Sequence, residues 1–183
     1  MSIIQTCPHC AANRPSRRAV VTAFAAAAIV TPTLASAEPA PDDERFMRIA
    51  LDEARRADFP FGAVIVRDGR EVVRGRNLGR RTNDPTAHGE MVAIRHAIGA
   101  HQGGRILKGA TLYTSGEPCA MCMGAILWCG FGRLVFAASL QQLATKIDQI
   151  MIPSADIAAK ASFAPISITG GVLAEEAMKL FGA

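Results

Sequence analysis

The sequence has very little excess of charge once residues 1–37 are set aside. Its formal net charge is +4 over 183 residues, but residues 1–37 contain three arginines and no acidic residue. The rest of the chain therefore has 17 basic and 16 acidic side chains, a net charge of +1. Proteins that bind duplexes or tRNA normally carry a concentrated basic patch. The charge distribution therefore disfavours a nucleic-acid partner.

The chain also lacks an uninterrupted apolar run of ~20 residues, which a transmembrane helix requires. The apolar stretch over residues 19–30 is interrupted by Thr31-Pro32-Thr33. A basic start precedes it and Ala35-Ser36-Ala37 follows it, an arrangement typical of a secretory signal peptide. We therefore predict that residues 1–37 are a signal peptide cleaved before Glu38, and that residues 38–183 form the mature domain, without stable membrane insertion. An uncleaved anchor and a wrongly assigned start are the alternatives.

Two arginines beside this stretch indicate a route of export. Ser16-Arg17-Arg18 resembles a twin-arginine signal, although a valine stands where phenylalanine or leucine is commoner. That route exports folded proteins, often with their metal bound, which suits thiolates that would otherwise oxidise in an oxidising compartment. We therefore expect a periplasmic or secreted protein. Cys7 and Cys10 lie before the twin-arginine pair, within residues 1–37, and are either a metal or redox pair or are removed with the signal peptide.

Three potential metal ligands occur without a fourth. His88 lies in the segment His88-Gly89-Glu90, and Cys119 and Cys122 lie in Pro118-Cys119-Ala120-Met121-Cys122. Two cysteines three positions apart share one face of a helical turn, so both can reach one ion. Zinc accepts imidazole and thiolate ligands, and structural zinc sites normally have four protein ligands. Three ligands therefore favour an open, catalytic zinc site over a closed structural one.

Glu90 has a different predicted role. It lies two residues from His88, a spacing that does not place both side chains on one face of a helix. We therefore expect the carboxylate to approach water at the metal and not the metal itself. Zinc lowers the pKa of such a water, and a nearby carboxylate can then carry protons.

The pattern H-x-E followed by P-C-x-x-C is the signature of zinc-dependent nucleobase deaminases. From about Arg45 to its C-terminus the sequence resembles the cytidine/deoxycytidylate deaminase superfamily, and within it the guanine deaminase and tRNA adenosine deaminase branch. The resemblance implies one Zn2+ per chain on His88, Cys119 and Cys122, with Glu90 as the catalytic residue. Glu90 would pass protons from water to the ring nitrogen and the leaving ammonia. The resemblance also implies a homodimer.

The predicted substrate is a small purine base or nucleoside, most simply guanine converted to xanthine. Pro60-Phe61-Gly62-Ala63 and Trp128 resemble guanine deaminases, and the resemblance implies substrate contacts from Phe61, Ala63, Asn77 and Trp128. Asp148 is a further candidate contact. Core packing for Phe61 and Trp128, and turn formation for Asn77, are the alternatives.

Two other functions stay open. A tRNA adenosine deaminase is supported by residues 172–181, which resemble the matching segment of those enzymes, although their extra basic helix is missing. A zinc-binding module without catalysis is the other, and the intact Glu90 argues against it. Glu117, usual in the family before Pro-Cys, is expected to hydrogen-bond a loop or to contact substrate.

The order of apolar segments predicts the fold class. Helical spacing marks residues 42–57, and β-branched or alternating segments mark strands at 61–66, 71–76, 110–115, 132–137 and 166–168. Asp68-Gly69 indicates a hairpin turn. Helices are expected from His88 to about Ala100, from Cys119 to Cys129, and over residues 154–161 and 172–181. We therefore predict an α/β domain, the three-layer α-β-α cytidine deaminase-like fold with a five-stranded mixed sheet.

Overall fold

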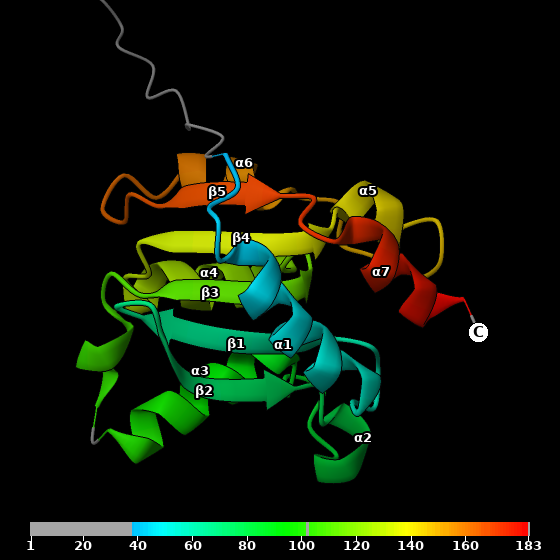
Figure 1. Ribbon diagram of the computed structural model, residues 1–183, viewed down its shortest axis with the longest axis horizontal. Coiled ribbons are helices and arrows are strands. Elements are labelled where there is room, and N and C mark those ends of the chain that lie inside the picture. Colours follow the sequence, from blue (N-terminus) through cyan, green and yellow to red (C-terminus); the bar gives the residue numbers. More distant parts are fainter. Residues whose placement is uncertain (1–37, 102, 183) are drawn as a thin grey trace, which may run out of the picture. The chain divides into compact units, whose positions relative to one another are not determined.

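The computed structural model describes residues 38–101 and 103–182. Its centre is a five-stranded sheet with the strand order β2-β1-β3-β4-β5 (Figure 1). The β1–β2 and β1–β3 pairs are antiparallel, and the β3–β4 and β4–β5 pairs are parallel. The predicted five-stranded mixed sheet is therefore confirmed. Its strands are β1 (Gly62–Arg67), β2 (Arg70–Arg76), β3 (Thr111–Gly116), β4 (Arg133–Ala138) and β5 (Ser167–Gly170).

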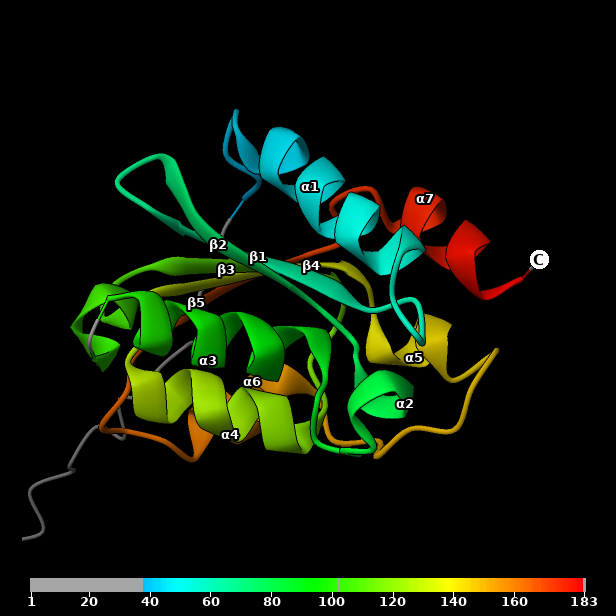
Figure 2. The same ribbon diagram turned by 90° about the horizontal axis from the view of Figure 1, so that it is seen from below.

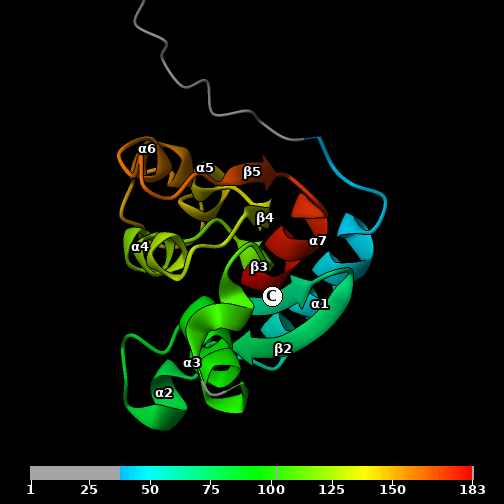
Figure 3. The same cartoon turned by 90° about the vertical axis from the view of Figure 1, so that its left-hand side faces the viewer.

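The two faces of the sheet are buried against different helices. Figure 2 shows α1 (Asp43–Arg55) and α7 (Ala174–Met178) on one face, with α3 (Gly89–Ala100), α4 (Ala120–Cys129) and α6 (Ser154–Ala159) on the other. Figure 3, which looks roughly along the strands, shows the same three layers. Successive strand residues point to opposite faces. Val64 accordingly packs with the α1 side, whereas its neighbours Ala63 and Ile65 pack with the α3 side.

The predicted hairpin turn joins β1 and β2. Both Asp68 (φ 51) and Gly69 (φ 70) have left-handed backbone conformations. A two-residue loop with this geometry matches the twist of antiparallel strands. Aspartate and glycine tolerate it better than other residues, which is why the sequence signal was reliable here.

Two glycines let helices approach the sheet closely. A Cβ atom at Gly62 would overlap the carbonyl oxygen of Ala50 in α1, so this glycine serves helix packing. On the other face, a Cβ at Gly75 would overlap the carbonyl oxygen of Gly89 at the start of α3. The first turn of α3, which carries Glu90, is therefore seated directly on β2.

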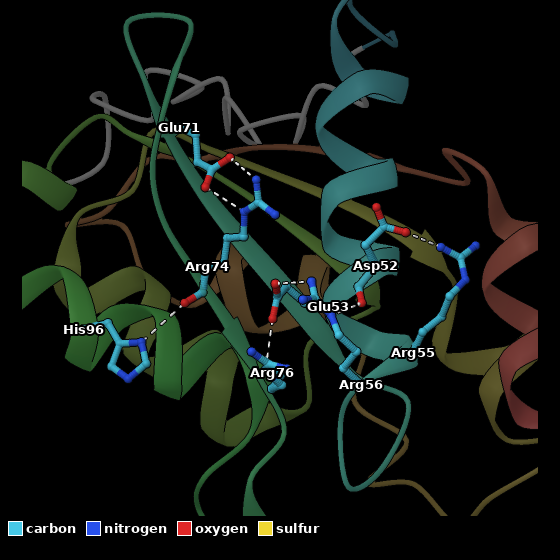
Figure 4. A network of polar contacts seen from close by, with 8 residues as sticks. All are labelled: Asp52, Glu53, Arg55, Arg56, Glu71, Arg74, Arg76 and His96. Atoms are coloured by element: carbon cyan, nitrogen blue, oxygen red, sulfur yellow. Dashed lines mark hydrogen bonds and ion pairs between the residues drawn. The ribbon is translucent and has the colours of Figure 1, made fainter.

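Glu53 ties the end of α1 to the end of β2. Its side chain is 4% exposed. One carboxylate oxygen accepts from Arg56 at 2.7 Å, and the other lies 3.0 Å from Arg76 (Figure 4). Arg76 is the last residue of β2 and directly precedes Asn77, so this contact helps to place Asn77.

The connections differ from the expected ones at two places. Between the strand predicted at 71–76 and the helix predicted from His88, where no helix was expected, the chain forms a short helix, α2 (Gly79–Thr82), which ends at Asn83 in the left-handed conformation (φ 50). The helix predicted over 172–181 begins only at Ala174, because Leu173 is left-handed (φ 58), and it continues as the 3-10 helix η2 (Lys179–Phe181). The remaining short elements are η1 (Gly104–Leu107) and α5 (Leu140–Leu143).

The predicted signal peptide, residues 1–37, lies outside the described residues. Among the helices that the structure does describe, none combines the length and the apolar character needed to cross a membrane.

Candidate zinc centre and active site

The three predicted ligands converge at the starts of two neighbouring helices. His88 immediately precedes α3 and Cys119 immediately precedes α4, and both have an extended backbone. Their ligand atoms and that of Cys122 all lie within 4.8 Å of one another. The His88 Nδ1 atom is 3.7 Å from Cys119 Sγ and 3.6 Å from Cys122 Sγ. One imidazole and two thiolates at these distances are a donor set that suits zinc and leaves one position for another ligand.

The three ligand side chains share protons through hydrogen bonds. A hydrogen bond from Cys122, assisted by one from His88, lowers the pKa of Cys119 to about 4. The same contact with Cys119, together with burial, raises the pKa of Cys122. The hydrogen bond with Cys119 also raises the pKa of His88. A bound zinc ion would replace the shared protons, since metal ligation requires deprotonated thiols and a neutral imidazole.

Glu90 lies beside the ligands and is not one of the clustered donors. Its side chain is 3% exposed. One carboxylate oxygen accepts from Cys122 Sγ at 3.6 Å, and the other accepts from Thr114 Oγ1 at 3.4 Å. Burial raises the pKa of Glu90, so this carboxylate takes up a proton more readily than an exposed one. The geometry therefore suits a group that gains and loses protons next to the metal.

A cavity of about 560 Å³ opens over His88 and Cys119. Ligand pockets of 300–1,000 Å³ are typical for small molecules. The aromatic side chains of Phe59 and Phe61, the amide of Asn77 and residues 147–150 form its walls. Figures 1 and 2 show that α2 and α5, which flank these walls, lie at the same end of the molecule.

A second lobe of about 410 Å³ adjoins this cavity. Phe59, Asn77 and His88 line both lobes, and Gly79, Arg80, Asn83 and Pro85 complete the second one. The Arg80 guanidinium lies 4.7 Å from the centre of the Phe59 ring. Among the described residues, Arg80 forms no ion pair. Neither Phe59 nor Arg80 belongs to a sequence motif, and the only local signal for Arg80 is its place in a polar stretch before His88.

Asn77 is held firmly at the junction of the two lobes. It is 4% exposed, and its Oδ1 atom accepts from the backbone N–H of Gly79 at 3.0 Å. Its own backbone N–H donates to Phe61 at 2.9 Å, and its carbonyl accepts from Asp58 at 3.0 Å. Two of the four expected contact residues, Phe61 and Asn77, therefore line the same cavity as the metal ligands His88 and Cys119.

Two other predicted contact residues lie elsewhere. Ala63 is fully buried in the core between β1 and the α3 face. Trp128 is in the last turn of α4, whereas Cys119 precedes its first, and the indole is 79% exposed. It stacks on Phe163 with ring centroids 4.7 Å apart and lines a separate hollow. Asp148, by contrast, lines the cavity over the ligands.

A family model described as the cytidine and deoxycytidylate deaminase zinc-binding region matches residues 40–138. This range covers more than half of the chain and includes His88, Glu90, Cys119 and Cys122. The chain therefore belongs to this zinc-binding deaminase family, and its three clustered ligands can hold the zinc ion.

Two curated relatives of the chain are deaminases with different substrates. The chain is 46% identical over 102 residues to a tRNA-specific adenosine deaminase of Haemophilus influenzae, a stretch that covers 53% of this chain and 58% of that protein. It is 50% identical over 82 residues to a guanine deaminase of Bacillus subtilis, covering 43% and 50% of the two chains. The matched stretch thus spans little more than half the length of these relatives.

Solved structures point to the same two groups. A guanine deaminase from Nitrosomonas europaea superimposes with a TM-score of 0.69 and 25% identity, covering 79% of this chain and 84% of that chain. A structure from a study of A-to-I editing by tRNA:A34 deaminases superimposes with a TM-score of 0.64 and 33% identity, covering 74% and 98%.

Proposed function

We propose that this protein is a zinc-dependent hydrolytic deaminase of a purine, with guanine, converted to xanthine and ammonia, as the first candidate substrate. The observation that carries the proposal is the buried Glu90 carboxylate, which contacts the ligand Cys122. Two other ligands of the same cluster, His88 and Cys119, line a cavity of suitable size. A module that only bound zinc would have no use for a buried carboxylate with a raised pKa at that place.

Hydrolytic deamination adds the oxygen of water to the amino-bearing ring carbon and releases the amino group as ammonia. Zinc, when bound, supplies a Lewis acid that lowers the pKa of water. Glu90 accepts one proton from the attacking water and passes it to the ring nitrogen. It then takes the second proton of that water, from the hydroxyl group now on the ring carbon, and passes it to the amine, which leaves as ammonia. Contacts from Thr114 and Cys122 hold the Glu90 carboxylate in place. Phe61 and Asn77, which line the cavity, orient the purine ring.

A tRNA adenosine deaminase is the second candidate, and the second lobe of the cavity favours it. A free base would occupy only the lobe over His88 and Cys119. A nucleoside within a polynucleotide also needs room for its ribose and phosphate, and the adjoining lobe offers Arg80, a cation without an ion-pair partner among the described residues. Arginine recognises phosphate well. The near-neutral charge of residues 38–183 argues against this candidate, because proteins that bind tRNA need basic side chains for its phosphates.

The deciding experiment measures ammonia release by the zinc-loaded full chain from guanine, adenine, guanosine, adenosine, cytosine and cytidine. Inosine formation in a tRNA anticodon stem-loop is measured in parallel. Guanine turnover without inosine formation supports the first candidate, and the reverse supports the second. One zinc per chain with no product from any substrate would favour the zinc-binding module.

We also propose that the protein is exported and forms a homodimer. The twin-arginine-like leader supports export, and sequencing the N-terminus of the exported protein tests it, since a chain that begins at Met1 would contradict cleavage before Glu38. Trp128 and Phe163, which are 79% and 60% exposed, are large apolar side chains of the kind that subunit contacts cover. Sedimentation of the wild type and of Trp128→Ala tests whether this surface joins two copies.

A further inference from the structure

One wall of the cavity has little regular structure of its own. The chain between α5 and α6 contains neither helix nor strand beyond residue 143, and residues 147–150 line the cavity over His88 and Cys119. Ile150, Met151 and Ile152 are 58%, 53% and 45% exposed, so little packing fixes this wall from outside. Its position must therefore depend on how its two ends are held.

Both ends are held by a single buried carboxylate. Glu117 is 7% exposed and lies between β3 and the first cysteine ligand. Its Oε2 atom accepts from the backbone N–H of Leu140, the first residue of α5, at 2.8 Å. Its Oε1 atom accepts from the backbone N–H of Ser154, the first residue of α6, also at 2.8 Å. Hydrogen bonds to an ionised acceptor are about twice as strong as neutral ones.

Further hydrogen bonds connect Glu117 and Ser154 to the metal centre and to β4. The Ser154 hydroxyl donates to the carbonyl oxygen of Pro118 at 3.3 Å, and Pro118 directly precedes Cys119. The backbone N–H of Glu117 donates to the carbonyl oxygen of Ala138 at the end of β4 at 2.8 Å. Glu117 thus lies where the start of α4, the end of β4 and both ends of the wall meet.

We propose that Glu117 is a positioning residue that sets the distance between the cavity wall at residues 147–150 and the zinc ligands. This inference rests on the proposed deaminase function for its kinetic consequence only. The Glu117 carboxylate hydrogen-bonds Leu140 and Ser154, and Glu117 does not line the cavity. Its loss should therefore loosen the wall and weaken substrate binding. Zinc binding by His88, Cys119 and Cys122, and proton transfer by Glu90, should continue.

The test compares Glu117→Gln and Glu117→Ala in the zinc-loaded full chain. Glutamine keeps one acceptor oxygen and replaces the other by an NH2 group, which cannot accept from a backbone N–H, so one end of the wall is released. Alanine releases both. We expect hydrogen exchange across residues 140–154 to increase in the order wild type, glutamine, alanine. We expect KM to rise about tenfold for glutamine and further for alanine, with kcat within about twofold and one zinc per chain.

Asp43→Asn is the matched control, because it removes another buried carboxylate on the opposite face of the sheet. This variant should be less stable than the wild type, but its KM should not rise. Its hydrogen exchange should not increase selectively in residues 140–154. Unchanged exchange in that segment for both Glu117 variants would overturn the proposal, as would loss of zinc or a fall in kcat at unchanged KM. An equal rise of KM in Asp43→Asn would also overturn it.

The exchange measurement separates this proposal from the proposed function. If the wild type deaminates nothing, the deaminase assignment fails, while the exchange of residues 140–154 still decides whether Glu117 holds the wall. If Glu117→Ala does not fold, Glu117→Gln alone carries the same comparison.

Discussion

Two carboxylates, Glu90 and Asp43, are almost equally buried on opposite faces of the sheet, yet their surroundings differ sharply. Asp43 accepts hydrogen bonds of 2.7–2.9 Å from the backbone of Ala40, the hydroxyl of Tyr113 and both terminal nitrogens of Arg133. The Glu90 carboxylate has weaker partners: a backbone group of Glu90 itself, Thr114 Oγ1 at 3.4 Å and Cys122 Sγ at 3.6 Å. The Asp43 carboxylate is fully paired, whereas Glu90 keeps hydrogen-bonding capacity for water and substrate.

The same difference appears in their protonation. Burial opposes ionisation of Asp43, but the hydrogen bonds from Arg133, Ala40 and Tyr113 lower its pKa below the ordinary value. Burial of Glu90 is not offset in this way, so its pKa is raised. Asp43 therefore contributes stability as an anion, whereas Glu90 is suited to exchange protons.

Glu90→Gln should produce the largest effect on activity. We expect deamination to fall by about 10²–10⁴-fold, because the amide cannot carry protons between water and substrate. Zinc content should stay at one per chain, since Glu90 is not among the clustered ligands. Ammonia release and metal analysis of the purified variant check this. Wild-type turnover by Glu90→Gln would remove the proton-transfer role from this residue.

Asp43→Asn should produce the largest effect on stability. Removing the charge leaves Arg133, whose side chain is 19% exposed, without its carboxylate partner. Breaking a buried ion pair from one side typically costs about 3–5 kcal/mol of unfolding free energy. Denaturant unfolding of the zinc-loaded variant measures the loss, and kcat/KM of the folded variant should match the wild type. A loss below about 1 kcal/mol, roughly the net contribution of one ordinary hydrogen bond, would contradict this role of Asp43.

The pH dependence of stability should separate Asp43 from the metal site. Because the pKa of Asp43 is lower in the folded chain than its ordinary value of 3.8, its contribution is complete above that value and is lost as pH falls through the folded pKa. The stability difference between wild type and Asp43→Asn should therefore be constant from neutral pH down to about 5 and shrink below about 4. Urea unfolding of both chains without zinc measures it. A difference that grows with acidification would have the wrong sign.

The zinc ligands were predictable from the sequence. Cys119 and Cys122 share the first turn of one helix, so their spacing alone brings them within reach of each other. His88 lies 31 positions before Cys119, at the start of another helix, and the family motif predicted that it joins them. Trp128 shows where such reasoning stops. At 1.5 Å per residue, its position in α4 places it about 13 Å along the axis from Cys119, away from the cavity.

The cavity walls depend on contacts between segments distant in sequence. Arg80 reaches the site on the short helix α2, and residues 147–150 reach it in a loop. No local pattern specifies the course of either segment. Glu117 was expected to bind a loop, but only the fold shows that its two oxygens hold residues 23 and 37 positions further along the chain. The family resemblance pointed to Glu117, but only the tertiary structure shows which backbone N–H groups it binds.

Glu53→Gln should have the smallest effect and sharpens the comparison between buried carboxylates. Glu53 is 4% exposed and is thus nearly as buried as Asp43 and Glu90. The side chains of its partners Arg56 and Arg76, however, are 53% and 33% exposed. Both arginines keep access to water when the charge is removed, and the glutamine oxygen still accepts one hydrogen bond. We therefore expect a loss of about 1–2 kcal/mol in unfolding free energy, measured beside Asp43→Asn under identical conditions. A loss as large as that of Asp43→Asn would mean that burial of the carboxylate alone, and not the burial of its cationic partner, determines the cost.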